Sequence, residues 1–163
     1  MQFTNDDVFR LVGRICIVYA TWDLFTTLVV LRLVKPTASL PKDFSRKTLG
    51  QKLRYLNRLA GDDVIDGGLL KSIGKTLPTA LEVAEKRNRF VHDLWVLDSN
   101  KVSKGELTLL SIEVATTSAG RSVRLPETQL SITDLRSLDD QVLHQQQIFS
   151  KWARILGVFD RPM

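Results

Sequence analysis

The chain has 163 residues, of which 44% are hydrophobic and 25% are charged. This balance is typical of a folded soluble protein rather than a disordered one, and the length predicts a single domain, residues 1–163, large enough to bury a core. The net charge of +5 favours polyanionic partners.

The single cysteine, Cys16, cannot form an internal disulfide and lies in an apolar run, so we expect a buried thiol and a reducing, cytoplasmic location. One cysteine and two distant histidines make a poor ligand set, so we predict no metal site and no cofactor.

The first predicted helix follows Thr4 and ends near Leu33. Thr4 suits the N-cap, and Asp7 stands three residues later, which is a variant of the capping box. Pro36 disfavours helical geometry at the residue before it, so the helix should end there. At ~1.5 Å per residue the helix would be about 43 Å long.

Residues 15–34 are apolar enough to raise the alternative of a membrane span. Asp23 lies near the middle of this segment, where a charge would cost ~3 kcal/mol in a bilayer. The acidic N-terminus also differs from the basic start of a signal peptide. We therefore expect no membrane insertion, and a long helix buried on more than one face in a bundle or a dimer.

The second predicted helix spans about Ser45 to Ala60, after a proline-bounded linker. Its apolar stripe consists of Leu49, Leu53, Leu56 and Ala60. Three cations align on another face: Lys47, Arg54 and Arg58. An ordinary solvated helix face explains such a row, and so does a surface that contacts RNA phosphates, which would bind in a salt-dependent manner. The pair Gly67-Gly68 predicts a turn-rich connection to the next helix.

The third predicted helix opens at Thr76, because threonine is a good N-cap and Pro78 in the first turn would lose no hydrogen bond. Its apolar stripe consists of Leu77, Leu81, Ala84, Val91 and Trp95. Asn88 falls within this stripe, Arg87 flanks it, and His92 lies one turn after Asn88. Polar groups at the edge of a core cost free energy unless they have partners.

Two explanations fit these three polar residues. In the structural one, Arg87 pairs with a carboxylate while Asn88 and His92 hydrogen-bond each other across one turn. In the functional one, the same groups form a binding or catalytic site.

After the third helix, alternating and β-branched residues predict a β-hairpin. Its first strand spans Glu106 to Thr117, a turn covers residues 118–121, and Ser122 to Leu125 returns as the second strand. We expect this hairpin to be a small insertion that packs on the helices or on a second subunit.

The last predicted helix begins near Ser131, where Asp134 occupies the third helical position, and Gly157 ends it. Thr133 is the competing N-cap. His144 lies off the apolar stripe and is expected to face solvent. The sequence thus predicts an all-α, up-and-down four-helix bundle with a small β-hairpin between the third and fourth helices.

The segment Arg87-Asn88-x-x-x-His92, on the third helix of such a bundle, resembles the R-x4-6-H motif of the HEPN superfamily. In that motif asparagine often follows the arginine, as it does here, whereas Asp93 stands where many members have glycine. The resemblance implies a metal-independent endoribonuclease that leaves a 2′,3′-cyclic phosphate. Histidine suits the proton transfers and arginine the phosphate charge, with Asn88 in support. The neighbouring cations Lys86 and Arg89 would add to RNA binding.

The resemblance also implies a homodimer in which two copies of the motif converge in a cleft. Many HEPN proteins act as toxins of toxin–antitoxin pairs or in antiphage defence, so an antitoxin or a nucleotidyltransferase would be a fitting partner. The alternative is a non-catalytic helical module that binds a protein partner within such a system.

Overall fold

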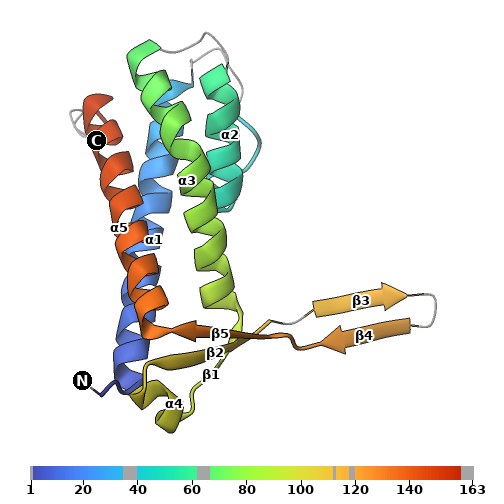
Figure 1. Cartoon of the computed structure of the whole chain (residues 1–163). Coiled ribbons are helices and arrows are strands. Elements are labelled where there is room, and N and C mark those ends of the chain that lie inside the picture. Colours follow the sequence, from blue (N-terminus) through green and yellow to red (C-terminus); the bar gives the residue numbers. More distant parts are fainter. Residues whose placement is uncertain (1, 35–39, 62–66, 112, 118–119, 159–163) are drawn as a thin grey trace. The chain divides into compact units, whose positions relative to one another are not determined.

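The computed structural model describes residues 2–34, 40–61, 67–111, 113–117 and 120–158 (Figure 1). The chain packs as two compact units, each built from segments far apart in sequence. Unit 1 comprises Met1–Cys16 and Lys86–Asp140, and unit 2 comprises Ile17–Glu85 and Gln141–Met163. The elements, in order, are α1 (Asn5–Leu33), η1 (Phe44–Arg46), α2 (Leu49–Gly61), α3 (Gly67–His92), β1 (Leu94–Val96), α4 (Ser99–Ser103), β2 (Glu106–Leu110), β3 (Glu113–Thr117), β4 (Gly120–Arg124), β5 (Glu127–Ser131) and α5 (Ile132–Ile155). The fold is therefore mostly helical with a small antiparallel sheet.

The predicted start and end of α1 are confirmed. The hydroxyl and backbone N–H of Thr4 both donate to the Asp7 carboxylate, at 2.8 and 2.9 Å, and the Asp7 N–H donates back to the Thr4 hydroxyl at 3.3 Å. This reciprocal capping box satisfies donors that the first turn leaves without intrahelical partners. The hydrogen bonds from Thr4 lower the pKa of Asp7.

Unit 2 has a helical core to which α1, α2, α3 and α5 all contribute. The Trp22 and Phe149 rings meet edge to face with centroids 5.8 Å apart, and Trp152 lies 4.6 Å from Phe149. Burial of such rings removes large apolar areas from water and dominates the packing energy. The buried apolar residues that these four helices contribute to unit 2 are Tyr19, Trp22, Val29, Val30, Leu33, Leu49, Leu53, Leu56, Ile73, Leu77, Ala80, Val83, Ala84, Val142, Phe149, Trp152 and Ala153.

Helix α2 begins four residues later than predicted, at Leu49 rather than Ser45. The N-cap is Thr48, whose N–H donates to Gln51 Oε1 at 3.1 Å while the Gln51 N–H donates to Thr48 Oγ1 at 3.4 Å. Ser45 instead belongs to the short 3-10 helix η1. The predicted core residues Leu49, Leu53 and Leu56 are buried; the side chain of Ala60 lies outside the described residues.

Helix α3 begins nine residues earlier than predicted, which corrects two assignments. Thr76 is not the N-cap, because its hydroxyl donates to the Ser72 carbonyl one turn before it at 3.1 Å, and Pro78 lies inside the helix. Gly67 and Gly68 begin the helix rather than forming a turn. A proline in a helix interior removes one backbone hydrogen bond. The burial of Ile73 and Leu77 before the proline, and of Ala80 after it, offsets the loss.

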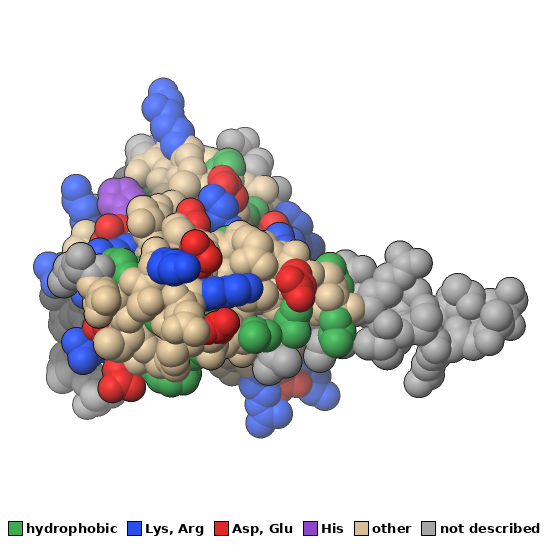
Figure 2. Space-filling view, turned by 60° about the horizontal axis from the view of Figure 1, so that its bottom comes forward, with side chains coloured by type: hydrophobic (Ala, Val, Ile, Leu, Met, Phe, Trp, Pro, Cys, Tyr) green, Lys and Arg blue, Asp and Glu red, His purple; other side chains and the backbone are tan. Residues whose placement is uncertain are grey.

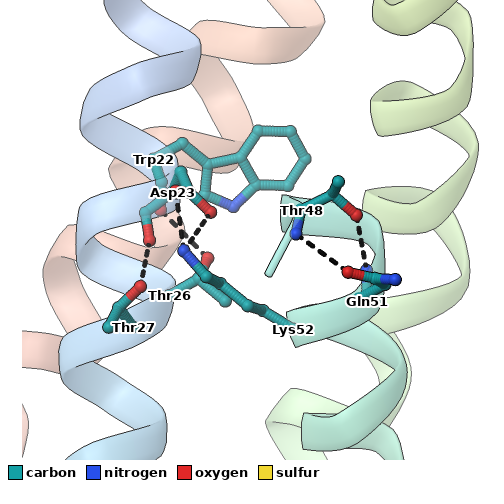
Figure 3. A network of polar contacts seen from close by, with 7 residues as sticks. All are labelled: Trp22, Asp23, Thr26, Thr27, Thr48, Gln51 and Lys52. Atoms are coloured by element: carbon teal, nitrogen blue, oxygen red, sulfur yellow. Dashed lines mark hydrogen bonds and ion pairs between the residues drawn. The ribbon is translucent and has the colours of Figure 1, made fainter. Parts of the chain in front are cut away.

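A lysine is buried in unit 2 beside the one acidic residue in the apolar part of α1. Lys52 is 1% exposed, and its ammonium donates to both carboxylate oxygens of Asp23, at 2.8 and 2.9 Å (Figure 3). The Thr26 and Thr27 hydroxyls donate to the backbone carbonyls of Trp22 and Asp23, one turn earlier in the helix. The charge of Asp23 is therefore compensated within unit 2. Among the described residues, α1 is also the one helix long and apolar enough to cross a membrane by length and composition.

The β structure of unit 1 is larger than the predicted hairpin. Strand β2 pairs antiparallel with both β1 and β5, so Leu109 lies opposite Trp95 on one side and Thr128 on the other. The predicted single strand from Glu106 to Thr117 is divided into β2 and β3, and β3 pairs with β4 in a separate two-stranded sheet. The return strand was predicted near its observed place, whereas β1, β5 and α4 were missed. Residues 118–119 of the predicted turn lie outside the described residues.

Two polar contacts define α5 where it begins in unit 1. The Ser131 hydroxyl and N–H donate to the Asp134 carboxylate at 2.7 and 2.8 Å, so Ser131 rather than Thr133 is the N-cap. The guanidinium of Arg14 on α1 donates through two nitrogens to Asp139, whose side chain is 2% exposed. In unit 2, Gly157 adopts a positive φ of 63° and ends the helix as predicted.

Candidate functional site

The three motif residues occupy the last turns of α3 in unit 1. Arg87 and Asn88 are half-buried, whereas His92, the final residue of the helix, is exposed. At 3.6 residues per turn, Arg87 and His92 lie about 7.5 Å apart along the helix axis and roughly 140° apart around it. Asn88 lies between them in angle, one turn before His92. Around the helix, the half-buried guanidinium of Arg87 comes first, the amide of Asn88 follows, and the exposed imidazole of His92 comes last.

Arg87 makes one long hydrogen bond to α1 and another to the next residue of its own helix. Its Nη2 donates to the Cys16 sulfur on α1 at 3.8 Å, and its Nη1 donates to Asn88 Oδ1 at 3.5 Å. Both contacts lie at the long end of the hydrogen-bond range. Cys16 was predicted to be buried, but it is half-buried because it lies at the edge of the α1 core face, beside this arginine.

The chain after His92 is anchored to the sheet. Trp95 was predicted to extend the helical stripe, but it lies in β1, and its indole N–H donates to the Phe90 carbonyl at 2.7 Å. That carbonyl belongs to the last turn of α3, where no intrahelical donor remains. The Ser111 hydroxyl donates to the Asp93 carboxylate at 2.6 Å. Asp93, the departure from the HEPN pattern, therefore ties the residue after His92 to the end of β2.

The two cations predicted beside the motif, Lys86 and Arg89, are both exposed on α3. Lys86 is one residue before Arg87, and Arg89 lies in the last turn of the helix. Exposed cationic side chains of this kind can contact the phosphates of a nucleic acid and contribute little to the packing of the protein core. Figure 2 brings the lower end of Figure 1 forward and shows Lys/Arg and Asp/Glu side chains interspersed on that face.

The row of cations predicted on the second helix lines one groove in unit 2. This α2 groove has a volume of about 300 Å³ and is lined by Pro41, Lys47, Gln51, Arg54, Tyr55 and Arg58. Lys47 is not in the helix as predicted, because it follows η1 with an extended backbone (ψ 150°), yet it reaches the same groove. Tyr55 and Gln51 also line the groove and were not predicted, although Gln51 stands four residues after Lys47 and four before Tyr55.

Two of the cationic side chains in the α2 groove, Arg58 and Arg54, contact neighbouring side chains. The Arg58 guanidinium lies over the Tyr55 ring, with its Cζ 5.6 Å from the ring centroid. Arg54 lies 3.5 Å from the Glu85 carboxylate, but both side chains are well exposed, at 60% and 70%. An exposed pair of this kind contributes ~0.2–1 kcal/mol, so a phosphate can displace the carboxylate at little cost.

A second groove of unit 2 is larger and less polar. It has a volume of about 480 Å³ and is lined by Leu69, Ser72, Thr76, Ile148, Lys151, Trp152 and Ile155. Lys151 is the one ionisable side chain among these lining residues, so this groove lacks the paired groups that acid–base chemistry needs. His144 is exposed, as predicted. Within the described ranges, no three His, Cys, Asp or Glu side chains gather in a group that could hold a metal ion.

No protein-family model, no curated protein and no solved structure matches this chain.

Proposed function

We propose that this protein is a metal-independent endoribonuclease of the HEPN type, with Arg87, Asn88 and His92 as its catalytic residues. The observation that carries the proposal is the exposed imidazole of His92 at the end of α3, one turn after a half-buried arginine–asparagine pair. The exposed His92 is not needed to fill the core. A scissile phosphate requires both a proton acceptor and a cation.

The reaction needs no metal, because the RNA supplies its own nucleophile. The 2′-oxygen attacks the adjacent phosphorus, a new O–P bond forms, and the bond from phosphorus to the 5′-oxygen breaks. His92 takes the proton of the 2′-hydroxyl, and the departing 5′-oxygen takes a proton from water or from a second imidazole. Arg87 stabilises the negative charge that grows on the phosphate oxygens, and Asn88 orients His92 or hydrogen-bonds the phosphate. The products carry a 2′,3′-cyclic phosphate and a 5′-hydroxyl.

The proposal includes a homodimer, and an exposed apolar row on the unit 2 part of α1 supports it. Ile17, Leu24 and Leu31 recur at a spacing of seven and are 71%, 55% and 49% exposed. Apolar residues at this spacing form the seam along which two helices associate. A second copy of the chain would bring a second motif into the assembly. In the cell such an enzyme would serve as a toxin or an antiphage effector restrained by a partner protein.

The same row favours the second candidate function, a non-catalytic module that binds a protein partner. The row would then receive a helix of an antitoxin, or of a nucleotidyltransferase, instead of a second copy. This candidate predicts that partner binding is complete in a His92→Ala protein and that the wild type cleaves no RNA.

The test is incubation of the purified protein with total cellular RNA in EDTA. We expect cleavage by the wild type, fragments ending in a 2′,3′-cyclic phosphate, and loss of cleavage in His92→Ala and Arg87→Ala. His144→Ala is the matched control, because it removes the other exposed histidine of the chain and should leave cleavage intact. Cleavage that survives both motif substitutions, or that EDTA abolishes, would exclude the mechanism.

A further inference from the structure

We propose that the α2 groove is a binding site for one nucleotide of single-stranded RNA, separate from the catalytic motif. Its phosphate contacts would be Lys47, Arg54 and Arg58, and its stacking platform would be Tyr55 with Arg58. The groove lies wholly in unit 2, whereas the catalytic motif lies in unit 1. The choice of RNA rather than DNA rests on the proposed endoribonuclease function; the groove itself rests on the contacts described next.

The charge of the groove points to an anionic ligand. Three of its lining side chains are cationic and none is acidic. Within the described ranges, Lys47 and Arg58 form no ion pair, and the pair between Arg54 and Glu85 is exposed at both ends. A groove whose described lining carries three cations and no acidic side chain attracts the phosphates of a nucleic acid, and binding releases their counterions.

The aromatic side chain points to a ligand that also has a planar group. Tyr55 is half-buried and is supported from one side by buried Phe44, with ring centroids 5.2 Å apart. The guanidinium of Arg58 lies over the Tyr55 ring, with its Cζ 5.6 Å from the ring centroid, so a cation and an aromatic ring share the groove. RNA-binding proteins stack unpaired bases on tyrosine rings and on arginine planes.

A polar side chain in the groove is oriented by the helix cap. Gln51 Oε1 accepts the Thr48 N–H at 3.1 Å, so the amide oxygen is engaged in the start of α2 (Figure 3). The amide nitrogen is directed away from Thr48 and can donate to a base carbonyl or to the ribose 2′-oxygen.

The size of the groove selects among nucleic acids. Its volume of about 300 Å³ is at the low end for small-molecule sites. This space fits a base and its phosphate but not a duplex, whose bases are also turned away from such a platform. Single strands are therefore the expected ligand.

The experiment measures binding without cleavage. The probe is a fluorescently labelled 2′-O-methyl oligouridylate, which lacks the 2′-hydroxyl nucleophile, titrated in EDTA and followed by anisotropy. Lys47→Ala/Arg58→Ala should weaken binding at least tenfold and lower the slope of log affinity against log salt by about 1.4, at ~0.7 per phosphate on single strands. The matched control is Lys71→Ala/Lys75→Ala, which removes the same charge from exposed positions of α3 and should change affinity less than twofold.

The aromatic step is tested separately. Tyr55→Leu should weaken binding about tenfold, because a stacked base contributes ~1–3 kcal/mol, whereas Tyr55→Phe should retain wild-type affinity. Thermal melts of each variant verify folding, since Tyr55 is half-buried. An equal loss in the α3 control, or wild-type binding by Tyr55→Leu, would overturn the proposal. So would equal competition by polyglutamate or by anionic lipid vesicles, since neither offers a base.

These outcomes are independent of the ribonuclease test. If RNA binds through the groove but no His92-dependent cleavage occurs, the groove stands and the enzyme proposal falls. If His92-dependent cleavage occurs while the groove variants bind like the wild type, only the groove proposal falls.

Discussion

Two cationic side chains enter the helical packing of this protein in different ways. Lys52 in unit 2 is 1% exposed and lies 2.8 Å from a carboxylate oxygen of Asp23. Arg87 in unit 1 is half-buried, and two of its hydrogen bonds, to Asn88 and to Cys16, are long, at 3.5 and 3.8 Å. Short charge-assisted bonds fix a side chain in the packing, whereas long bonds to neutral groups can be exchanged for a ligand at small cost. In the proposed function, Lys52 would serve the fold and Arg87 would contact the substrate.

Among substitutions of these two cations, the largest expected effect is on the rate of RNA cleavage. Arg87→Lys keeps the positive charge but loses the planar fork, so cleavage should fall by about 10²–10³ while the thermal midpoint changes little. Lys52→Met is the reciprocal change and should alter the thermal midpoint without altering cleavage per folded molecule. Initial rates on labelled RNA and calorimetric melts measure both. A shared loss of stability in the two variants would show that Arg87 is a packing residue as well.

The next effect is on stability and depends on which partner of the buried pair is removed. Asp23→Ala leaves the Lys52 ammonium buried without its carboxylate and should cost about 3–5 kcal/mol. Lys52→Met should cost less, because the Asp23 side chain is 32% exposed and can be hydrated. Asp23→Leu/Lys52→Met should recover much of the loss. Denaturant unfolding measures all three, and equal costs for the two single variants would contradict the assigned asymmetry.

The exposed row on α1 provides a smaller effect, on assembly. Leu24→Glu places a charge in the centre of the row and should weaken self-association at least tenfold in sedimentation experiments. Ile155→Glu is the matched control, because Ile155 is 62% exposed on α5 and lies outside the row. Equal dissociation by both substitutions, or none by either, would remove α1 as the dimer seam.

The parts of the fold that the sequence predicted are those set by local chemistry. The caps at Thr4 and Ser131 and the end at Gly157 each depend on hydrogen bonds or backbone angles within a few residues. The start of α3 was predicted wrongly, because Pro78 lies inside the helix, where buried neighbours such as Leu77 and Ala80 stabilise it against its local preference. The three-stranded sheet was missed because β2 pairs with strands before and after it in the chain, and β1 has only three residues.

In the candidate sites, too, features set by local spacing were predicted, whereas features set by tertiary packing were not. Helical spacing aligned Arg54 with Arg58 correctly, but it could not show that Lys47, outside α2, reaches the same groove or that Tyr55 supports Arg58. The partner of Asp23 is 29 residues away, on another helix, so no local pattern identifies it. Short motifs thus name the chemical groups, whereas tertiary packing decides which of them share a surface.

The smallest expected effect concerns polar contacts made within a single turn. Hydrogen bonds from Ser131 lower the pKa of Asp134 below its ordinary value of 3.8. A carboxyl whose pKa is lower in the folded protein stabilises the fold above its unfolded pKa, and this stabilisation is lost as the pH falls through the folded pKa. Ser131→Ala should therefore lower stability by about 1 kcal/mol at neutral pH, and the difference from the wild type should shrink below pH 4. Melts across this pH range measure the effect, with Ser137→Ala, in the interior of the same helix, as the control. A difference that stays constant down to pH 2 would mean that the Ser131 hydroxyl acts through packing and not through the carboxylate of Asp134.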